Sequence, residues 1–286
     1  MCYTGRKSTE RGAGLSEREA RKLENTEALY GLFSDDPIAC AHMLANLEDA
    51  FAPYCDWYGI GVGDEIDATV LVYTAYRIPL VTTYGQAGGV QEILSAFHHE
   101  LPGRAVVHIQ PHHLGASDRT FEADTLVPIL RLALEREHFA PVATDHVEIE
   151  ALSHRSTGEI IELYQFYPDN FFEPSQLDSG RFYGVRVDGR LVSVTGVHSV
   201  SERAQIATLG HLVTHPDFRG RGLSTACTSH LCARLLESGI DLMALNVRRQ
   251  NRSAVRVYEK LGFRYHDTYL EGFADKAGKP RQGHLL

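Results

Sequence analysis

The chain has 286 residues, of which 43% are hydrophobic, and its formal net charge at pH 7 is −9. This length suits two domains of ordinary size, each with a real hydrophobic core. The acidic balance argues against nucleic acid as a partner and is compatible with a cationic substrate, and the lack of a signal peptide or a long apolar run predicts a soluble, cytoplasmic protein with no membrane partner.

The first half begins with polar and charged residues, and we expect residues 1–23 to form a poorly ordered arm or a weak helix. A first domain is expected over residues 24–145. Its hydrophobic patterns predict a helix over 34–51, a strand pair within 56–76, a helix after a turn at Gly88 and Gly89, and a strand over 105–110.

The second half, residues 146–286, has a clearer alternation of helical and strand patterns. The Asp188-Gly189 pair is a typical hairpin turn. The patterns predict, in chain order, a helix over 156–166, a hairpin over 182–200, a strand over 206–214, a helix over 223–238, a strand over 242–247, a helix over 251–263 and a final strand over 265–274.

A glycine-rich loop, HPDFRGRGLS, joins the strand ending at Thr214 to the next helix. The first amides of a helix have no intrahelical partners, and the aligned peptide dipoles place roughly half a positive charge there. Gly220 and Gly222 leave the backbone accessible, while Arg219 and Arg221 add positive charge. The loop therefore predicts an anion site, although a tight connection with solvated arginines would have the same local sequence.

The spacing of the glycines and arginines in this loop can be compared with the known phosphate-binding motifs. A GxGxxG fingerprint would need a glycine where Thr225 stands, and no Lys-Ser/Thr pair completes a Walker loop. The pattern Arg/Gln-x-x-Gly-x-Gly/Ala is met by Arg219, Gly222 and the small Ser224. This resembles the acyl-CoA pyrophosphate loop of the GNAT acetyltransferase superfamily.

A second family motif follows in the expected order. The pattern Asn-x-x-Ala-x-x-x-Tyr-Glu-x-Leu-Gly-Phe is matched at every defined place, by Asn251, Ala254, Tyr258, Glu259, Leu261, Gly262 and Phe263. The resemblance implies tandem GNAT-like folds of the α/β (α+β) class, with a mixed, mostly antiparallel sheet flanked by helices. The half over 24–145 would be degenerate and the half over 146–286 catalytic.

The resemblance also implies a function and a site. The function is direct transfer of an acetyl group from the co-substrate acetyl-CoA to a primary amine; a non-catalytic acyl-CoA-binding or sensing protein is the alternative. Small amines, amino acids, antibiotics and protein termini are all open as acceptors, and a small molecule is favoured because a second domain could narrow the acceptor cleft. Tyr258 would protonate the leaving thiolate, although a tyrosine in an apolar stripe is otherwise a core residue. The residues expected to bind acetyl-CoA are Leu212, Val213, Thr214, Arg219, Gly220, Arg221, Gly222, Leu223, Ser224, Thr225, Asn246, Asn251 and Ala254.

The group that accepts the amine's proton is not defined by either motif. Deprotonating an amine with a pKa near 10.4 at pH 7 costs about 4.6 kcal/mol. Where family members often carry a carboxylate, this sequence has Thr208 and Asn246, which cannot act as bases. His198, His211, Glu271 or a water chain are the candidates, although for each histidine a packed or solvent-exposed strand residue is the favoured interpretation.

Two further expectations concern metals and the first half. His108, His112 and His113 are spaced across Pro111 and have no carboxylate motif beside them, so we expect no metal site. The segment 85–89 of the first half lacks arginine, so we expect no CoA site there. The partner is expected to be a small-molecule amine, and a homodimer is possible.

Overall fold

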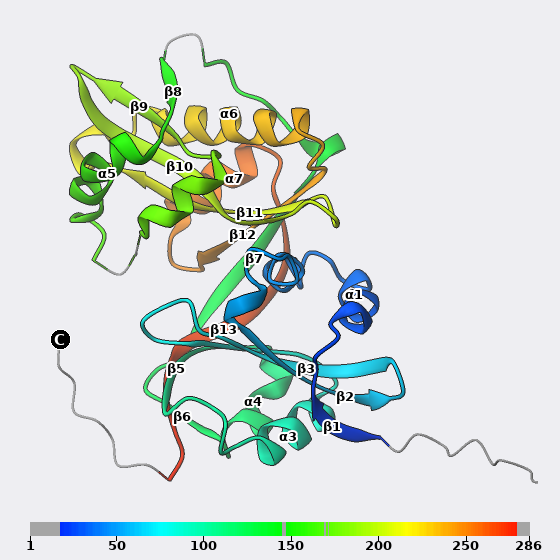
Figure 1. Ribbon diagram of the computed structural model, residues 1–286. Helices are drawn as coiled ribbons and strands as arrows, with labels where there is room; N and C mark the ends of the chain where they lie inside the picture. Colours follow the sequence, from blue (N-terminus) through cyan, green and yellow to red (C-terminus); the bar gives the residue numbers. More distant parts are fainter. Residues whose placement is uncertain (1–17, 145–146, 169, 171, 279–286) are drawn as a thin grey trace, which may run out of the picture.

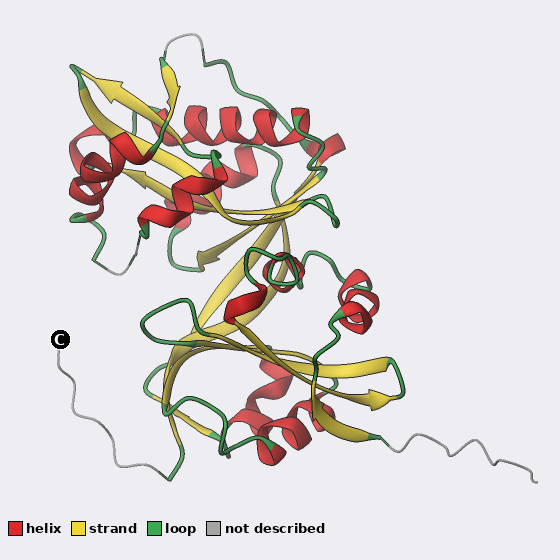
Figure 2. Ribbon diagram, in the orientation of Figure 1, coloured by secondary structure: helices red, strands yellow, loops and turns green. Residues whose placement is uncertain are grey.

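The computed structural model describes residues 18–144, 147–168, 170 and 172–278 (Figure 1). In these ranges the chain forms two lobes that share one sheet of thirteen strands, with helices on both sides of each lobe (Figure 2). The strand order is β1-β2-β3-β4-β5-β13-β7-β12-β11-β10-β9-β8, and β6 pairs with β13. Within the same ranges, no helix has both the length and the apolar character needed to cross a membrane.

The first half supplies the lower lobe of Figure 1. Its elements are β1 (Glu19–Lys22), α1 (Glu27–Ser34), α2 (Ala41–Ala45), β2 (Cys55–Val62), β3 (Glu65–Tyr73), β4 (Leu80–Gly85), α3 (Ala87–Ala96), β5 (Arg104–Ile109), α4 (Leu114–Ser117), β6 (Phe121–Ala123) and β7 (Val127–Glu135).

The second half repeats a similar order. Its elements are β8 (Ile149–Ala151), α5 (Thr157–Tyr164), β9 (Tyr183–Val187), β10 (Arg190–Ser201), β11 (Ile206–Thr214), α6 (Leu223–Glu237), β12 (Leu242–Arg248), α7 (Arg252–Lys260) and β13 (Arg264–Lys276). Two parallel strand pairs, β4 with β5 and β11 with β12, stand among antiparallel neighbours. The predicted fold class, a mixed and mostly antiparallel sheet in two similar halves, is confirmed.

Three local predictions for the first half differ from the structure. The helix expected over 34–51 is shortened to α2 at Ala41–Ala45, and α1 ends at Ser34, because Pro37 disfavours helical geometry at the residue before it. Gly88 and Gly89 lie inside α3 and not in a turn before it; a Cβ on Gly89 would approach the Cβ of Ala68 to 2.7 Å, so close helix packing requires glycine there. Residues 19–22 of the expected arm form a strand that pairs with β2, whereas residues 1–17 lie outside the described ranges.

The two halves exchange strands at the centre of the sheet. β7, from the first half, pairs with β12 over residues 129–135 and with β13 over residues 127–133. β13, from the end of the chain, pairs on its other side with β5. Figure 1 shows β7 and β13 crossing together from one lobe to the other. Each lobe is therefore completed by a strand of the other half.

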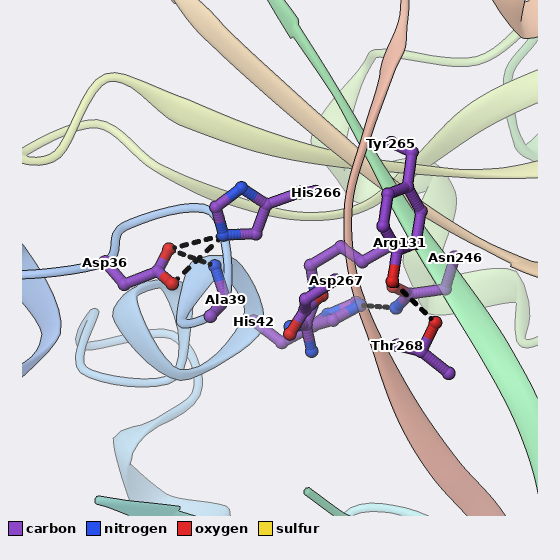
Figure 3. A network of polar contacts seen from close by, with 9 residues as sticks. All are labelled: Asp36, Ala39, His42, Arg131, Asn246, Tyr265, His266, Asp267 and Thr268. Atoms are coloured by element: carbon purple, nitrogen blue, oxygen red, sulfur yellow. Dashed lines mark hydrogen bonds and ion pairs between the residues drawn. The ribbon is translucent and has the colours of Figure 1, made fainter. Parts of the chain in front are cut away.

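The α1–α2 segment lies between the lobes and binds to both. Its buried side chains share a hydrophobic cluster with Ile206 and Ala244 of the second half. Two polar contacts add to this packing: the His266 ring lies 2.9 Å from Asp36, and the amide of Asn246 lies 3.1 Å from His42 Nε2 (Figure 3). The first half thus places α2 directly over strands of the second half.

Candidate functional site

The parallel strands β11 and β12 separate part-way along their length. Their pairing starts at Ile206 with Leu242 and ends at Leu209 with Leu245. Beyond that point β11 continues to Thr214 and β12 to Arg248 without pairing to each other. The separation leaves backbone groups on the facing edges of both strands free to bind a ligand at the carboxyl ends of the strands, where ligands commonly bind in such sheets.

A β-bulge in β11 accompanies this separation. Between Val213 and Gly210, the two residues His211 and Leu212 face only one residue of β10. His211 has a φ of 59°, which is left-handed and rare for a residue with a side chain. Such strain costs about 1–3 kcal/mol and is found mostly at functional sites, and the bulge bends the strand away from its neighbour.

Gly210, just before the bulge, allows two histidines to pack together. A Cβ at this position would lie 2.0 Å from His198 Nε2, so no other residue fits beside that ring. The His198 and His211 rings pack with their centroids 4.4 Å apart. Both rings line the cavity described below.

The glycine-rich loop has the geometry expected of an anion site. Gly220 and Gly222 have φ values of 76° and 79°, which explains why the sequence has glycine at both positions. Gly222 is the N-cap of α6 and gives no side-chain cap, and no acidic residue stands in the first turn. The amides of residues 223–225 therefore point out of the helix with uncompensated positive charge.

The two arginines of the loop bind protein groups. The Arg219 guanidinium donates to the carbonyl of Thr214 at 3.3 Å and to the hydroxyl of Tyr167 at 3.0 Å. Arg221 donates to the carbonyl of Asp217 at 3.1 Å and lies over the ring of Phe218. In this structure the arginines thus brace the loop, and the exposed donors at its centre are backbone amides.

A cavity of about 880 Å³ extends from the separated strands to the space between the two halves. Among the predicted site residues, Leu212, Asn246, Asn251, Tyr258, His198 and His211 line it. The loop residues 219–225 stand outside the lining, at the start of α6, while Val213 and Ala254 pack into hydrophobic clusters and Thr214 is buried at the end of β11. Asn251 also caps α7, because its side chain accepts the amide of Ala254 at 3.2 Å.

Tyr258 reaches the cavity from α7. The residue is only 6% exposed and packs against Phe263, with ring centroids 5.8 Å apart. Burial raises the pKa of its hydroxyl well above the usual value, so the group holds its proton throughout the neutral range. It can therefore serve as a proton donor.

Comparison with known proteins identifies this arrangement. Residues 145–263 match the model of the acetyltransferase (GNAT) family. Over these residues the second half of the chain resembles acetyltransferases of the GNAT family. An acetyltransferase of Yersinia pestis is 34% identical over 96 residues, which are 33% of this chain and 65% of that protein. The mycothiol acetyltransferase of Streptomyces coelicolor is 35% identical over 95 residues, which are 32% of this chain and 30% of that protein. The match spans less than two thirds of the length of each relative.

The fold of the whole chain is also found in the GNAT family. A tandem GNAT protein from the clavulanic acid biosynthesis pathway superposes with a TM-score of 0.61 over 93% of this chain and 100% of that one, at 14% identity. At this identity the likeness shows the fold alone. It confirms that the first half, too, has a GNAT-like architecture.

In the first half, a histidine lies at the point that corresponds to the separation of β11 and β12 in the second half. β4 and β5 also run parallel, and their pairing ends at Thr82 with His108. The buried ring of His113 lies at this point, with Nδ1 2.9 Å from the hydroxyl of Thr83 and Nε2 2.8 Å from the carbonyl of Gly85. Binding of acetyl-CoA in the second half alone stays a prediction.

Three histidines around the cavity are neutral; His211 is buried, and His198 and His42 are half-buried. Burial lowers the pKa of His198 to about 4 and lowers the pKa values of His211 and His42 well below the usual value. His211 Nδ1 is 2.7 Å from the hydroxyl of Tyr164, while its Nε2 has no partner among the described residues. The Oδ1 atom of Asn246 is also buried without a partner in this part of the chain.

Glu271, on β13, is a carboxylate of the cavity. Burial would raise its pKa, but His108, Arg248 and Tyr269 together lower it below the usual value, so the group is ionised at neutral pH. His108 Nε2 lies 2.9 Å from the carboxylate and the Tyr269 hydroxyl lies 3.4 Å from it. The first half thus supplies a direct partner of this residue.

Sequence reasoning missed the part of the cavity made by the first half and by α5. His42 of α2 and Tyr164 and Tyr167 of the α5 region bind predicted site residues directly. No motif marks them, because they reach the site only through packing between elements far apart in the chain. The cluster of histidines in the first half was the one available signal: His108 and His113 bind protein groups in this structure.

The buried histidines predict that stability falls in acid. His113 and His198 have pKa values of about 4 in the folded protein, whereas an unfolded histidine titrates near 6.5. The unfolded chain therefore binds protons that the folded chain does not, and stability that is complete above pH 6.5 is lost as the pH falls towards 4. Each histidine contributes about 1.4 kcal/mol per pH unit. Urea unfolding across this range should show a smaller pH slope for His113→Asn, and an unchanged slope would contradict the assignment.

Proposed function

We propose that this protein is an acetyl-CoA-dependent N-acetyltransferase that transfers an acetyl group directly to a primary amine of a small molecule. The observation that carries the proposal is the separation of β11 and β12 beyond Leu209, with the uncapped start of α6 at one end and a cavity containing Tyr258 at the other. A thioester bound between the strands would contact the start of α6 at one end and Tyr258 at the other.

Different parts of the second half would bind the different parts of acetyl-CoA. The amides of residues 223–225 would hold the pyrophosphate, and the edge of β11 at Leu212 and Val213 would bind the pantetheine arm, whereas the amide and carbonyl of Thr214 are bound by Tyr167. Acetyl-CoA supplies an activated acyl group with a thiolate as leaving group. Tyr258 is protonated and lines the cavity, so it can give its proton to that thiolate.

The acceptor is a small molecule because of the size and position of the cavity. Its volume of about 880 Å³ lies in the range of pockets for small ligands. The α1–α2 segment of the first half covers it and is tied to the second half by the Asp36–His266 and His42–Asn246 contacts. Acceptor and thioester would share one cavity, as direct transfer requires.

Thr208 and Asn246, in place of carboxylates, favour a sensing role without catalysis, whereas Tyr258 in the cavity favours catalysis. A binding protein would need the anion site but not an acid placed in the cavity. Release of CoA measured with a panel of primary amines, together with mass detection of the acetylated product, separates the two functions. Binding of acetyl-CoA without release of CoA in the presence of any amine would overturn the proposed activity.

Acetyl-CoA should raise the melting temperature, and a carboxylate in the first turn of α6 should remove that shift. Binding to the folded state alone stabilises it by mass action. In Ser224→Glu the new charge repels the pyrophosphate, yet it stabilises the free helix by about 0.3–1 kcal/mol through the helix dipole. The substitution should therefore raise the melting temperature of the free protein and reduce the further rise given by acetyl-CoA. These opposite changes distinguish a loss of binding from a loss of folding.

The matched control is Ser224→Gln, which has nearly the same shape and no charge. It should retain most of the shift given by acetyl-CoA in differential scanning fluorimetry. If Ser224→Glu were stabilised by acetyl-CoA as strongly as the wild type, the pyrophosphate would not bind at this helix.

A further inference from the structure

We propose that the acceptor carries two amine groups joined by an apolar body: one reacts beside Asn246, and the other is bound as a cation by Glu271 at the far end of the cavity. The inference rests on the proposed function and names the class of its acceptor. It starts from two oxygen acceptors that line the same cavity, one on β12 and one on β13.

The end of the cavity at Asn246 is the reacting end. Asn246 follows Leu245, the last residue of β12 that pairs with β11, so it stands where the strands open. Its Oδ1 is buried without a partner in the described part of the chain, although its amide group is 3.1 Å from His42. A buried acceptor without a donor is costly, and an amine N–H of the acceptor molecule would satisfy it.

Glu271 is well suited to bind a second, cationic group. Arg248 also lines the cavity and is one of the groups that lower the pKa of Glu271. Of the other charged side chains there, Asp124 pairs with Arg104 at 3.6 Å and Arg131 with Asp267 at 2.7 Å. Both of these are matched by permanent charges of the opposite sign. Glu271 binds directly to His108, which is charged only when protonated, and about a third of its side chain is open to the cavity.

The sheet register separates the two acceptors by a long span. Asn246 is opposite Arg131 of β7, and Glu271 is opposite Val127 of the same strand. Four residues along β7 and two strand spacings across it place their α-carbons roughly 16 Å apart on a flat sheet. A single ammonium group cannot contact both oxygens, so the acceptor that uses both must be elongated.

The lining carries aromatic rings beside Glu271 and on the wall made by the first half. Tyr269 and Phe273 flank Glu271 at alternate positions of β13 and so share its face of the sheet. Tyr73 and Tyr76 from the first half pack edge to face, with centroids 5.2 Å apart. Such rings favour an apolar body and attract cations to their faces.

The test uses two amines of equal length that differ in one charge. Diaminooctane carries an amine at each end, and octylamine carries one. The ratio of kcat/KM for the diamine to that for the monoamine should be about tenfold or more in the wild type, as expected for one charged hydrogen bond. In Glu271→Gln the ratio should fall close to one. Glu122→Gln, an exposed carboxylate on β6 outside the cavity, is the matched control and should keep the wild-type ratio.

Calorimetry on the CoA-loaded protein gives the same ratio from binding alone. A preference for the diamine that Glu271→Gln leaves intact, or no preference in the wild type, would overturn the inference while acetyl transfer still upheld the proposed function. If neither amine is acetylated but the diamine binds in a Glu271-dependent way, the acceptor class stands and the proposed reaction fails.

Discussion

Replacing Tyr258 with phenylalanine is expected to lower kcat for acetyl transfer by a factor of about 10² to 10⁴, with little change in CoA affinity. The substitution removes one oxygen atom and keeps the ring that packs against Phe263. Because burial keeps the hydroxyl protonated, the variant loses a proton donor and no charge. The loss corresponds to roughly 3–5 kcal/mol of activation free energy.

The rate should be measured at saturating amine beside the dissociation constant of CoA. The loss should shrink with acyl donors whose thiol leaves easily, since a good leaving group needs less protonation. Tyr265→Phe is the control: this tyrosine is 60% exposed and its hydroxyl binds Thr268 away from the cavity. A Tyr258→Phe enzyme within about threefold of the wild type would make Tyr258 a packing residue.

Ending the chain after Phe263 is expected to unfold both halves and not only the second. The deletion removes β13, which pairs with β5 and β6 of the first half and with β7 at the centre of the sheet. It also removes the buried side chain of Tyr269 from the middle of the sheet. The loss should exceed the whole stability of a typical domain, about 5–15 kcal/mol.

A chain that ends after Gly278 is the matched control, because it retains all of β13. It should melt cooperatively, as we also expect of the full chain. The shorter chain should show no cooperative transition by circular dichroism and no protected amides in β2 and β3, which lie far from the deletion in the sheet. Protected amides in those strands would mean that the first half folds without the last strand.

The sequence predicts the second half closely because its signals are local. The Asp188-Gly189 turn, the glycines of the loop and the Asn251 cap each fix backbone geometry within a few residues, and the structure has β9–β10, α6 and α7 where these signals indicate. Tyr258 and Asn251 line the cavity, as expected for residues whose motif combines spacing with helix geometry.

The rest depends on contacts that no local pattern records. β5 pairs with β13, which follows it far along the chain, and no pattern within β5 or β13 indicates this partner. The left-handed φ of His211 arises from a register shift with β10, so its role in separating the strands cannot be seen from the residue itself. His42 enters the site because two distant segments pack together, and a single sequence does not show this.

The exchange of β7 and β13 sets an order of events during synthesis. The first half is made first, yet the neighbour of β5 in the sheet is the last strand to be made. From the end of β5 at Ile109 to the end of β13 at Lys276 the ribosome adds 276 − 109 = 167 residues, which takes about 8–33 s at roughly 5–20 residues per second. During that time the β5 edge stays open to other chains, so the nascent protein has a period of exposure that a domain with its own closing strand avoids.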